Sequence, residues 1–462
     1  MMRKKKLWIL LFCLVLLLTT CVDNSLQNSS KETRADDNRL VIWWNKGYYT
    51  AEDEAIQKVV KDWEQESGIE VKLCFFSDED ILQQAVIALE QGNVPDVFFS
   101  DRADGTVGPR WIWDGKLANV SGVVEPIGEL FDAAALKAVH RYSKISNEQS
   151  YYAVPLEANT IHIHYWRDLL AQAGFQEADI PRQWDAFWQF WRQAQDSLRD
   201  QGVYSVYGLG LTMSREATDT SFQFEQILEA YDVQLLDQNG NLRLDNPEVR
   251  QQLIDALDWF TSFYEGNYVP PTASEWLDAD NNFNFLNRIT LMTLNNTLSI
   301  PGSQREDEDI YFNQIATIEF PQKPDGEDLR YIITINQAFI FADSPQQKAA
   351  KDFLAYLVQP EHLGDYIKGA RGRWFPVMPK LRQDPFWEDT KDPHIAIAVK
   401  QFTQSEMRPM YDALNPAYSQ VLSENIWGQA IEKIILSSKS PEMAADEAIR
   451  EIKDIFETWG SQ

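Results

Sequence analysis

The chain has 462 residues, of which 44% are hydrophobic, and its 70 Asp and Glu against 42 Lys and Arg give a formal net charge of −28 at pH 7. A chain of this length can bury a large apolar core and form more than one lobe. The strong negative charge argues against nucleic acid and anionic lipid headgroups as partners.

The first twenty residues have the pattern of an export signal. Four basic residues within Met1–Lys6 precede an unbroken apolar run from residue 7 to 18. As a helix this run would rise about 18 Å, which is too short for a bilayer core of about 30 Å. A basic segment before a short apolar one is typical of a signal peptide and not of a membrane span.

The residues that end this run resemble a bacterial lipobox, in which the cysteine is acylated before the signal is removed. Leu18-Thr19-Thr20 is followed by Cys21, and residues 22–38 are polar, with little to bury. We therefore expect a signal peptide at 1–20 and a lipidated Cys21 with a polar tether at 21–38. The protein would then be exported and held at the outer face of the cytoplasmic membrane, or in the periplasm, by its lipid alone.

Cysteine and histidine usage argues against disulfides and metals. Cys13 falls within the signal and Cys21 at its end, so Cys74 is the single thiol left in the mature domain. His162 and His164 have a spacing that a metal can use on a strand, but no third His or Cys is near them in the sequence. We also find no G-x-S-x-G, Walker-type or H-E-x-x-H motif, so we expect no metal, no cofactor and no catalytic residues.

Strands and helices alternate from residue 39 onward. Residues 40–44, 69–76 and 96–99 have the apolar character of buried strands, and they are separated by helical patterns at 52–67 and 79–91. This βαβαβ order predicts an α/β fold with mainly parallel sheets flanked by helices. We expect further helices at 184–199, 247–264, 346–358 and 444–459, and a small hairpin around Asn239-Gly240.

Six ordered groups of residues carry a resemblance to a known family. They are Trp63–Val71 after the opening strand, Gly92–Val97, Trp113–Ala118, Tyr152–Pro155 with Tyr165–Leu170, Pro181–Asp185, and Ala349–Leu354 with Gly372–Val377. Together, over residues 40–377, they resemble the family 1 extracellular solute-binding proteins of ABC importers. That family includes the maltose- and other oligosaccharide-binding proteins.

The resemblance implies a two-lobed fold of the periplasmic-binding-protein type, with a hinge between the lobes. By the matching segments, lobe one would hold residues 39–156 and 311–366, and lobe two residues 157–310 and 367–462. The ligand would be enclosed when the lobes close, because it makes more contacts with the closed state.

Candidate ligand contacts follow from the rule that open parallel sheets bind ligands beyond the carboxyl ends of their strands. The rule selects residues after the first and third strands, and the resemblance adds residues at the lobe crossing, in lobe two and late in the chain. A carboxylate can accept hydrogen bonds from adjacent sugar hydroxyls, and an aromatic ring can cover the apolar face of a sugar. The expected contacts are Trp43, Trp44, Asn45, Asp101, Arg102, Glu157, Asn159, Trp276, Asn295, Asn296, Arg373 and Trp374.

Core packing is an alternative role for the aromatic candidates. Trp44 and Trp374 fit a cleft wall or the core equally well, and Trp276 fits ordinary loop packing better than a cleft. The pattern of the sequence does not separate these roles.

The expected function is capture of a sugar, as a mono- or oligosaccharide or a related glycoside, and its delivery to the permease subunits of an ABC transporter. We expect a monomer that is not an enzyme. One alternative is a non-sugar ligand, namely glycerol phosphate, a polyamine or a metal complex. The other is an exported glycoside hydrolase, which would need two carboxylates about 5 to 10 Å apart.

Overall fold

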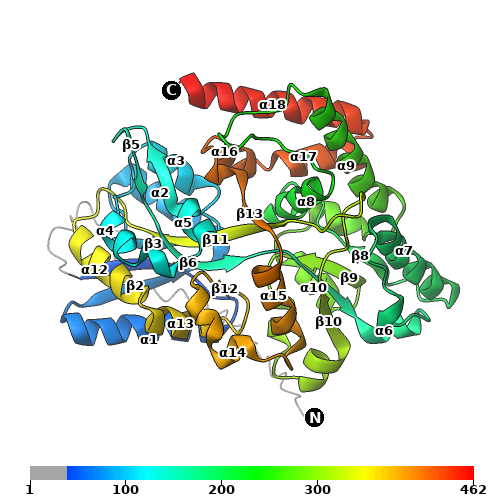
Figure 1. The fold of residues 1–462 in the computed structure, drawn as a ribbon, viewed down its shortest axis with the longest axis horizontal. Helices are drawn as coiled ribbons and strands as arrows, with labels where there is room; N and C mark the ends of the chain where they lie inside the picture. Colours follow the sequence, from blue (N-terminus) through cyan, green and yellow to red (C-terminus); the bar gives the residue numbers. More distant parts are fainter. Residues whose placement is uncertain (1–38, 462) are drawn as a thin grey trace, which may run out of the picture.

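The computed structural model describes residues 39–461 (Figure 1). The predicted signal peptide, Cys21 and the tether lie outside the described residues. Within the described range the chain forms two main sheets with helices packed around them (Figure 1).

The chain opens with the predicted βαβαβ order. Strands β1 (Leu40–Asn45), β2 (Val71–Phe76) and β3 (Val97–Phe99) are parallel, with β1 in the middle, and α1 (Thr50–Ser67) and α2 (Asp78–Gln91) connect them. Gly68 and Gly92 end the two helices with φ of 71° and 65°, a left-handed conformation that glycine adopts without steric cost. The sequence prediction of this unit is confirmed.

The first sheet has seven strands and is mixed. Its order is β12 (Phe375–Pro376), β6 (Val154–Asn159), β11 (Tyr331–Phe339), β3, β1, β2, with β13 (Met407–Pro409) beside β11. β11 runs antiparallel to both β3 and β6. The parallel pairs in this sheet are β1 with β2, β1 with β3 and β11 with β13, and β11 meets β3 and β6 in antiparallel pairs because the chain returns from the second sheet in the opposite direction.

The second sheet has four strands in the order β10 (Ile315–Ile318), β7 (His162–Trp166), β9 (Thr290–Asn295), β8 (Tyr207–Gly210). Only β8 and β9 are parallel. Helix α7 (Trp184–Asp200) covers this sheet with Trp184, Trp188 and Trp191, which lie on one face of the helix and are almost fully buried. A two-stranded ribbon, β4 (His140–Ser143) with β5 (Glu148–Tyr151), stands apart from both sheets.

The remaining α-helices are α3 (Val107–Trp113), α4 (Ser121–Val124), α5 (Ala133–Val139), α6 (Arg167–Gln172), α8 (Thr218–Ala230), α9 (Pro247–Glu265), α10 (Asp280–Leu286), α11 (Ser299–Ser303), α12 (Gln347–Leu357), α13 (Pro360–Gly369), α14 (Pro385–Glu388), α15 (Pro393–Gln404), α16 (Tyr418–Ser423), α17 (Ile426–Ile435) and α18 (Pro441–Ser461). The four later helices predicted from the sequence are confirmed within three residues at each end. The predicted hairpin is reduced to one bridge, Leu236 to Leu242. No helix of the described residues is both long and apolar enough to cross a membrane.

Each main sheet has its own apolar core. The largest buried cluster surrounds the second sheet and includes residues of α7, α8, α9, α17 and α18. Two further clusters pack on the first sheet. Cys74 is buried in β2 and is the one cysteine among residues 39–461.

Strand pairing places the crossings between the sheets differently from the expected boundaries. Residues 157–159 stay in β6 of the first sheet, and β10, which was expected in lobe one, pairs with β7 in the second sheet. β12 and β13, which were expected in lobe two, join the first sheet. The chain crosses where strands end, for example at Thr160 and Ile161 between β6 and β7, and motif matching alone does not locate such positions.

Candidate functional site

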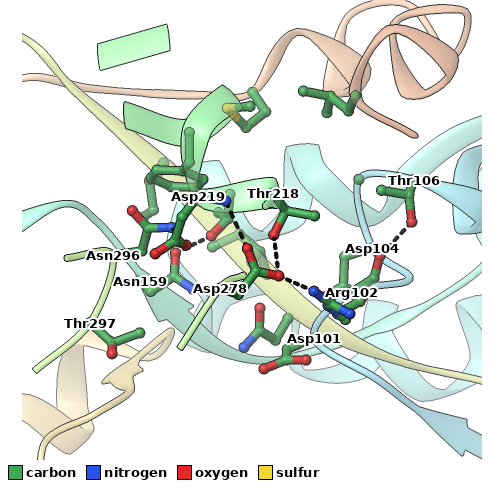
Figure 2. A pocket seen from close by; sticks show the side chains of 18 of the residues that line it. Asp101, Arg102, Asp104, Thr106, Asn159, Thr218, Asp219, Asp278, Asn296 and Thr297 are labelled. Carbon is green, nitrogen blue, oxygen red and sulfur yellow. Dashed lines mark hydrogen bonds and ion pairs between the residues drawn. The ribbon is translucent and has the colours of Figure 1, made fainter. Parts of the chain in front are cut away.

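A cavity of about 250 Å³ lies between the two main sheets, near the ends of several strands (Figure 2). The segment after β3 and the N-terminal part of α8 line opposite sides of this cavity. Two strands of the first sheet also contribute to the lining, β6 with Asn159 and β11 with Thr334, Asn336 and Gln337. The lining combines carboxylates, amides, hydroxyls and guanidinium groups with apolar side chains such as Ile333, Ile335 and Leu422. This is the kind of surface that can hold a small hydrophilic ligand in a fixed orientation.

The turn after β3 supplies Asp101, Arg102 and Asp104. Its shape is held by hydrogen bonds from the Arg102 backbone NH to Ser100 Oγ (3.3 Å) and from the Gly108 NH to the Ala103 carbonyl (2.8 Å). Asp104 Oδ1 accepts a hydrogen bond from the Gln337 backbone NH (3.2 Å), which fixes the turn against β11.

The carboxylates of this turn sit in an environment that disfavours their charge. Burial, together with the nearby Asp78 carboxylate, raises the pKa of Asp101 to about 7. Burial raises the pKa of Asp104 well above its usual range, and the charge of Asp101 adds to the effect. Asp101 Oδ1 and Asp104 Oδ2 are buried without a hydrogen-bond partner.

On the opposite side, Asp219 lies in the first turn of α8, where a carboxylate is favoured by the helix dipole. It accepts hydrogen bonds from the side-chain amides of Asn281 (3.1 Å) and Asn296 (2.5 Å). Burial raises the pKa of Asp219 to about 7, although Arg102 acts in the other direction. Asn295, at the end of β9, donates to Ser299 Oγ (2.9 Å).

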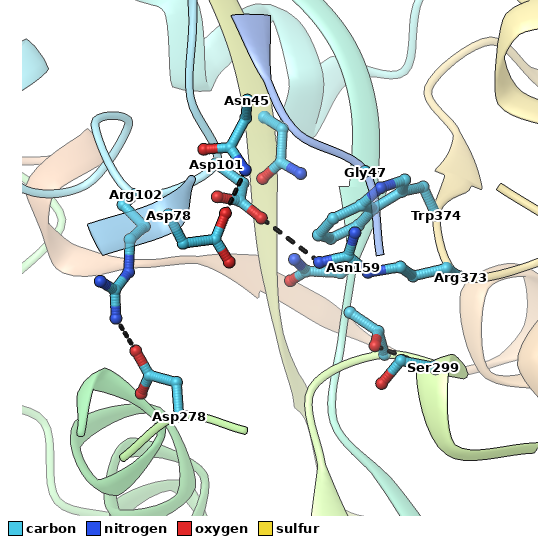
Figure 3. A network of polar contacts seen from close by, with 12 residues as sticks. Asn45, Gly47, Asp78, Asp101, Arg102, Asn159, Asp278, Ser299, Arg373 and Trp374 are labelled. Carbon is cyan, nitrogen blue, oxygen red and sulfur yellow. Dashed lines mark hydrogen bonds and ion pairs between the residues drawn. The ribbon is translucent and has the colours of Figure 1, made fainter. Parts of the chain in front are cut away.

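Ion pairs and hydrogen bonds join the two sides of the cavity directly. Arg102, from the turn after β3, forms an ion pair with Asp278, which also accepts hydrogen bonds from the Asp219 backbone NH and Thr218 Oγ1, both at 3.0 Å (Figures 2 and 3). Tyr49 Oη donates to the Ser299 carbonyl (2.8 Å). These contacts hold the two sides together in this conformation.

A network around Arg373 forms another part of the wall (Figure 3). Arg373 Nη1 lies 3.1 Å from Glu52 Oε2, and its Nη2 lies 3.5 Å from Asp101 Oδ2. The guanidinium also stacks over the Trp374 ring, 4.3 Å from its centre, and Trp374 Nε1 donates to Glu52 Oε2 (3.2 Å). Although burial disfavours its charge, the carboxylates of Glu52 and Asp101 raise the pKa of Arg373, so it stays a cation.

The structure brings most of the predicted contact residues to this cavity. Those in its lining are Asp101, Arg102, Asn159, Asn295, Asn296, Arg373 and Trp374. Asn45 donates to Asp78 and lines a much smaller pocket beside the cavity, together with Trp44, Asp101, Arg373 and Trp374. That these side chains contact a ligand stays a prediction.

The other four candidates lie outside the main lining. Trp43 packs on Phe76 (4.8 Å between ring centres), and Trp44 stacks on Phe99 (4.3 Å) in the core of the first sheet. Glu157 is buried in β6, where it accepts a hydrogen bond from Asn336 (3.1 Å).

Trp276 belongs to the core of the second sheet and donates to Thr272 Oγ1 (3.2 Å). For the three tryptophans, packing against apolar neighbours takes the ring away from the cavity. Glu157 instead lies beneath the lining, because its strand passes behind it.

Sequence reasoning missed five lining carboxylates: Asp78, Asp104, Asp219, Asp278 and Asp412. Asp219 could have been found by the same rule about strand ends, because α8 is the next helix after β8. Asp78 begins the helix after β2 and could have been found in the same way. Asp278 lies in an irregular segment and Asp104 is oriented by a backbone contact more than 200 residues away, so no local signal marks either of them.

The described residues contain no group of three or more His, Cys, Asp and Glu side chains that could hold a metal ion. His162 and His164 are buried and engage different partners, Gln401 Oε1 (2.5 Å) and Thr317 Oγ1 (2.9 Å). Burial lowers the pKa of His162 to about 4. Both imidazoles, which belong to β7, are thus held by hydrogen bonds within the core around this strand.

Comparisons with known proteins agree with this architecture. The family model described as bacterial extracellular solute-binding protein matches residues 58–397. The chain is 22% identical over 377 residues to YcjN of Escherichia coli (strain K12), which is named as an ABC transporter periplasmic-binding protein, and the match covers 81% of each chain.

Solved structures share the fold. An ABC transporter solute-binding protein of Thermotoga lettingae, bound with α-D-tagatose, superposes with a TM-score of 0.73 at 20% identity, covering 91% of this chain and 100% of that one. Maltose-bound MalE3 of T. maritima gives 0.70 at 19% identity, covering 90% and 99%. A sugar transporter protein of Arthrobacter chlorophenolicus with bound laminaribiose gives 0.71 at 15% identity, also covering 90% and 99%. The two-lobed fold and the match over most of the sequence lead to one conclusion: the chain belongs to the bacterial extracellular solute-binding proteins, a family of transport binding proteins.

Proposed function

We propose that this protein captures a sugar in the cavity between its lobes and delivers it to the permease of an ABC importer. The observation that carries the proposal is the lining itself, in which charged and amide side chains from both sides face one cavity beside the Trp374 ring. Carboxylates and amides can bind neighbouring hydroxyls in pairs, and an aromatic ring can cover the apolar face of a sugar. The sugars in the related solved structures support the same class of ligand.

Binding and release would depend on rotation of the two lobes. We assign residues 39–159 and about 331–410 to lobe one, and about 162–330 and 411–461 to lobe two, following the strand pairing. The hinge would lie where β6 leads into β7 and where the chain enters β11. In this scheme the Arg102–Asp278 pair stabilises the closed arrangement, and the ligand leaves unchanged, so the protein is a binder and not an enzyme.

The predicted lipid on Cys21 would keep the monomer close to its permease, on the outer side of the cytoplasmic membrane. The polar residues 22–38 would give the folded part reach and rotational freedom.

A non-sugar cation such as a polyamine is the second candidate ligand, because six carboxylates and only three guanidinium groups line the cavity. The same imbalance argues against glycerol phosphate, whose negative charge would add to it.

A thermal-shift screen with mono- and oligosaccharides, polyamines and glycerol phosphate tests the proposal. We expect one or more sugars to raise the unfolding temperature in a concentration-dependent way, because a ligand that binds only the folded state stabilises it. Stabilisation by polyamines with no response to any sugar would refute sugar capture. Incubation of the stabilising sugar with the protein, followed by an assay for new reducing ends, tests for hydrolysis, which we expect to be absent.

A further inference from the structure

The cavity contains more carboxyl groups than cations. Six carboxylates line it, from Asp78, Asp101, Asp104, Asp219, Asp278 and Asp412. The cations in the same lining are Arg102, Arg141 and Arg373. No lysine or histidine of the described residues is in this lining.

Each of the three guanidinium groups is already committed. Arg102 pairs with Asp278. Arg141 Nη2 lies 2.7 Å from Asp412 Oδ2 in a buried pair.

Arg373 is shared. It lies 3.1 Å from Glu52, which is outside the lining, and 3.5 Å from Asp101. Glu52 is the closer partner, so Asp101 has only part of one cation.

Asp104 and Asp219 have no cationic partner within ion-pair distance. Asp104 is 7% exposed and accepts one backbone hydrogen bond, from Gln337, through its Oδ1. Its Oδ2 is buried without a hydrogen-bond partner. Asp219 receives hydrogen bonds from two neutral amides. A buried carboxylate without a cation is expensive to keep ionised, which agrees with the raised pKa of both groups.

The unpartnered carboxylate oxygens of the lining lie on one side of the cavity, while the amide oxygens of Asn282 and Asn296 lack a partner on the other side. Asp101 Oδ1 and Asp104 Oδ2 both lack a hydrogen-bond partner, and both residues belong to the turn after β3 (Figure 2). The two carboxylates act on each other electrostatically, and Asp78 acts on Asp101 in the same way. A positive charge placed against Asp101 Oδ1 and Asp104 Oδ2 would be attracted by several carboxylates at once, and the one protein cation within ion-pair distance, Arg373, lies at the other oxygen of Asp101.

We infer that the ligand is a sugar that bears a protonated amine, and that its ammonium group lies against Asp101 and Asp104 while its hydroxyls reach the amide-rich side formed by Asn159, Asn295 and Asn296. The inference rests on the proposed function and narrows its ligand class. A neutral sugar would bring no cation to stabilise the ionised form of these carboxylates.

The test uses the full chain, purified in detergent, and compares matched sugars by calorimetric titration. The probes are D-glucosamine, D-galactosamine, D-mannosamine and the chitosan disaccharide, each beside its N-acetyl and its hydroxyl counterpart. We expect at least one amino sugar to bind ten or more times more tightly than both of its neutral counterparts. Acetylation removes the charge, and the hydroxyl counterpart keeps the hydrogen bonding without it.

Two isosteric variants locate the effect. Asp104→Asn should remove most of the amine preference, and Asp200→Asn, at an exposed position outside the lining, should keep it, although both change the net charge equally. If Asp104→Asn does not fold, proton linkage in the unaltered protein serves instead. At about pH 6.5 a sugar amine is already protonated, so ionisation of Asp101 and Asp104 on binding should release protons and make the heat more exothermic in ACES buffer than in phosphate.

The outcomes separate the inference from the function on which it rests. Equal or tighter binding of the neutral sugars, or an amine preference that survives Asp104→Asn, overturns the amino-sugar inference and leaves sugar capture intact. Proton uptake on binding overturns it as well. Binding of none of these sugars, while putrescine or spermidine binds, overturns both.

Discussion

Replacing Trp374 by alanine tests whether this ring belongs to the binding surface or only supports the fold. Trp374 is 4% exposed, yet it lines the cavity, and it lies outside the three apolar clusters of the core. One face of the ring is covered by the Arg373 guanidinium, and its Nε1 donates to Glu52.

We expect Trp374→Ala to change both the affinity for the sugar and the stability of the fold. Loss of a ring face that stacks on a sugar should weaken binding by about 10- to 100-fold, which is about 1.4 to 2.8 kcal/mol. The cost in stability should fall below the about 3–5 kcal/mol of a core tryptophan. Glu52 would not be left alone, because it keeps Arg373 at 3.1 Å and the Tyr49 backbone NH at 3.1 Å.

Trp276→Ala is the matched control. Trp276 is 3% exposed, packs inside the core of the second sheet and does not line the cavity. We expect its truncation to cost about 3–5 kcal/mol of unfolding free energy, with the affinity of the surviving folded protein nearly unchanged. Urea unfolding followed by circular dichroism measures stability, and calorimetric titration with the sugar found by the thermal-shift screen measures affinity. The reasoning is refuted if Trp374→Ala binds as tightly as the parent protein, or if Trp276→Ala loses affinity to the same extent.

Three further predictions concern the anchor, the lobes and the pH dependence. Cys21→Ser should abolish labelling by radioactive fatty acid and partitioning into the detergent phase, and unchanged partitioning would contradict lipidation. Arg102→Met should remove the pair with Asp278 and enlarge the radius of gyration of the unliganded protein in X-ray scattering. It should weaken sugar binding by about two- to fivefold, since a pair that is about a quarter exposed contributes about 0–1 kcal/mol. The same radius in both proteins would show that this pair does not hold the lobes together. Burial raises the pKa values of Asp104 and Glu157 well above their usual range, so the folded protein keeps protons that the unfolded chain loses. The unfolding free energy should therefore fall as the pH rises from about 6.5 to 8.5. The decrease should be at most about 1.4 kcal/mol per pH unit for each group. Urea melts at both pH values measure this, and Asp104→Asn should reduce the slope; a slope of the opposite sign would contradict the protonated state.

The sequence predicts the α/β framework well because its signals are local. The strand β1, the helix α1 and the glycine that ends this helix lie within 30 residues, and each follows from periodicity and capping alone. Asp101 and Arg102 could be placed at the cavity for the same reason, since they directly follow a short buried strand. The rule about strand ends needs only the position at which one strand ends, and the pattern of apolar residues locates that position.

Tertiary contacts decide the remainder of the site. A tryptophan in a cleft wall and one in the core are both buried, so neither Trp44 nor Trp374 could be assigned from the sequence, and the structure puts the first in the core and the second in the lining. Asp278 reaches the cavity because the Asp219 backbone and Thr218 hold it there. The crossings between the sheets escaped prediction because β10 and β11 look alike as strands and differ only in the partners that they meet.

In the proposed mechanism, closure of the lobes buries carboxyl groups at a free-energy cost, and a ligand that binds these groups would offset that cost. Burial is the main cause of the raised pKa of Asp101 on one side and of Asp219 on the other. Closing the lobes without a ligand would therefore require both carboxylates to lose water or to take up a proton, which costs free energy. The Arg102–Asp278 pair, whose side chains are about a quarter exposed, would offset only part of this free-energy cost. A ligand that hydrogen-bonds to these carboxylates replaces the lost water, so its binding energy is largest in the closed state. By the logic of linked equilibria, such a ligand shifts the protein toward closure, and the empty protein opens again to receive the next one.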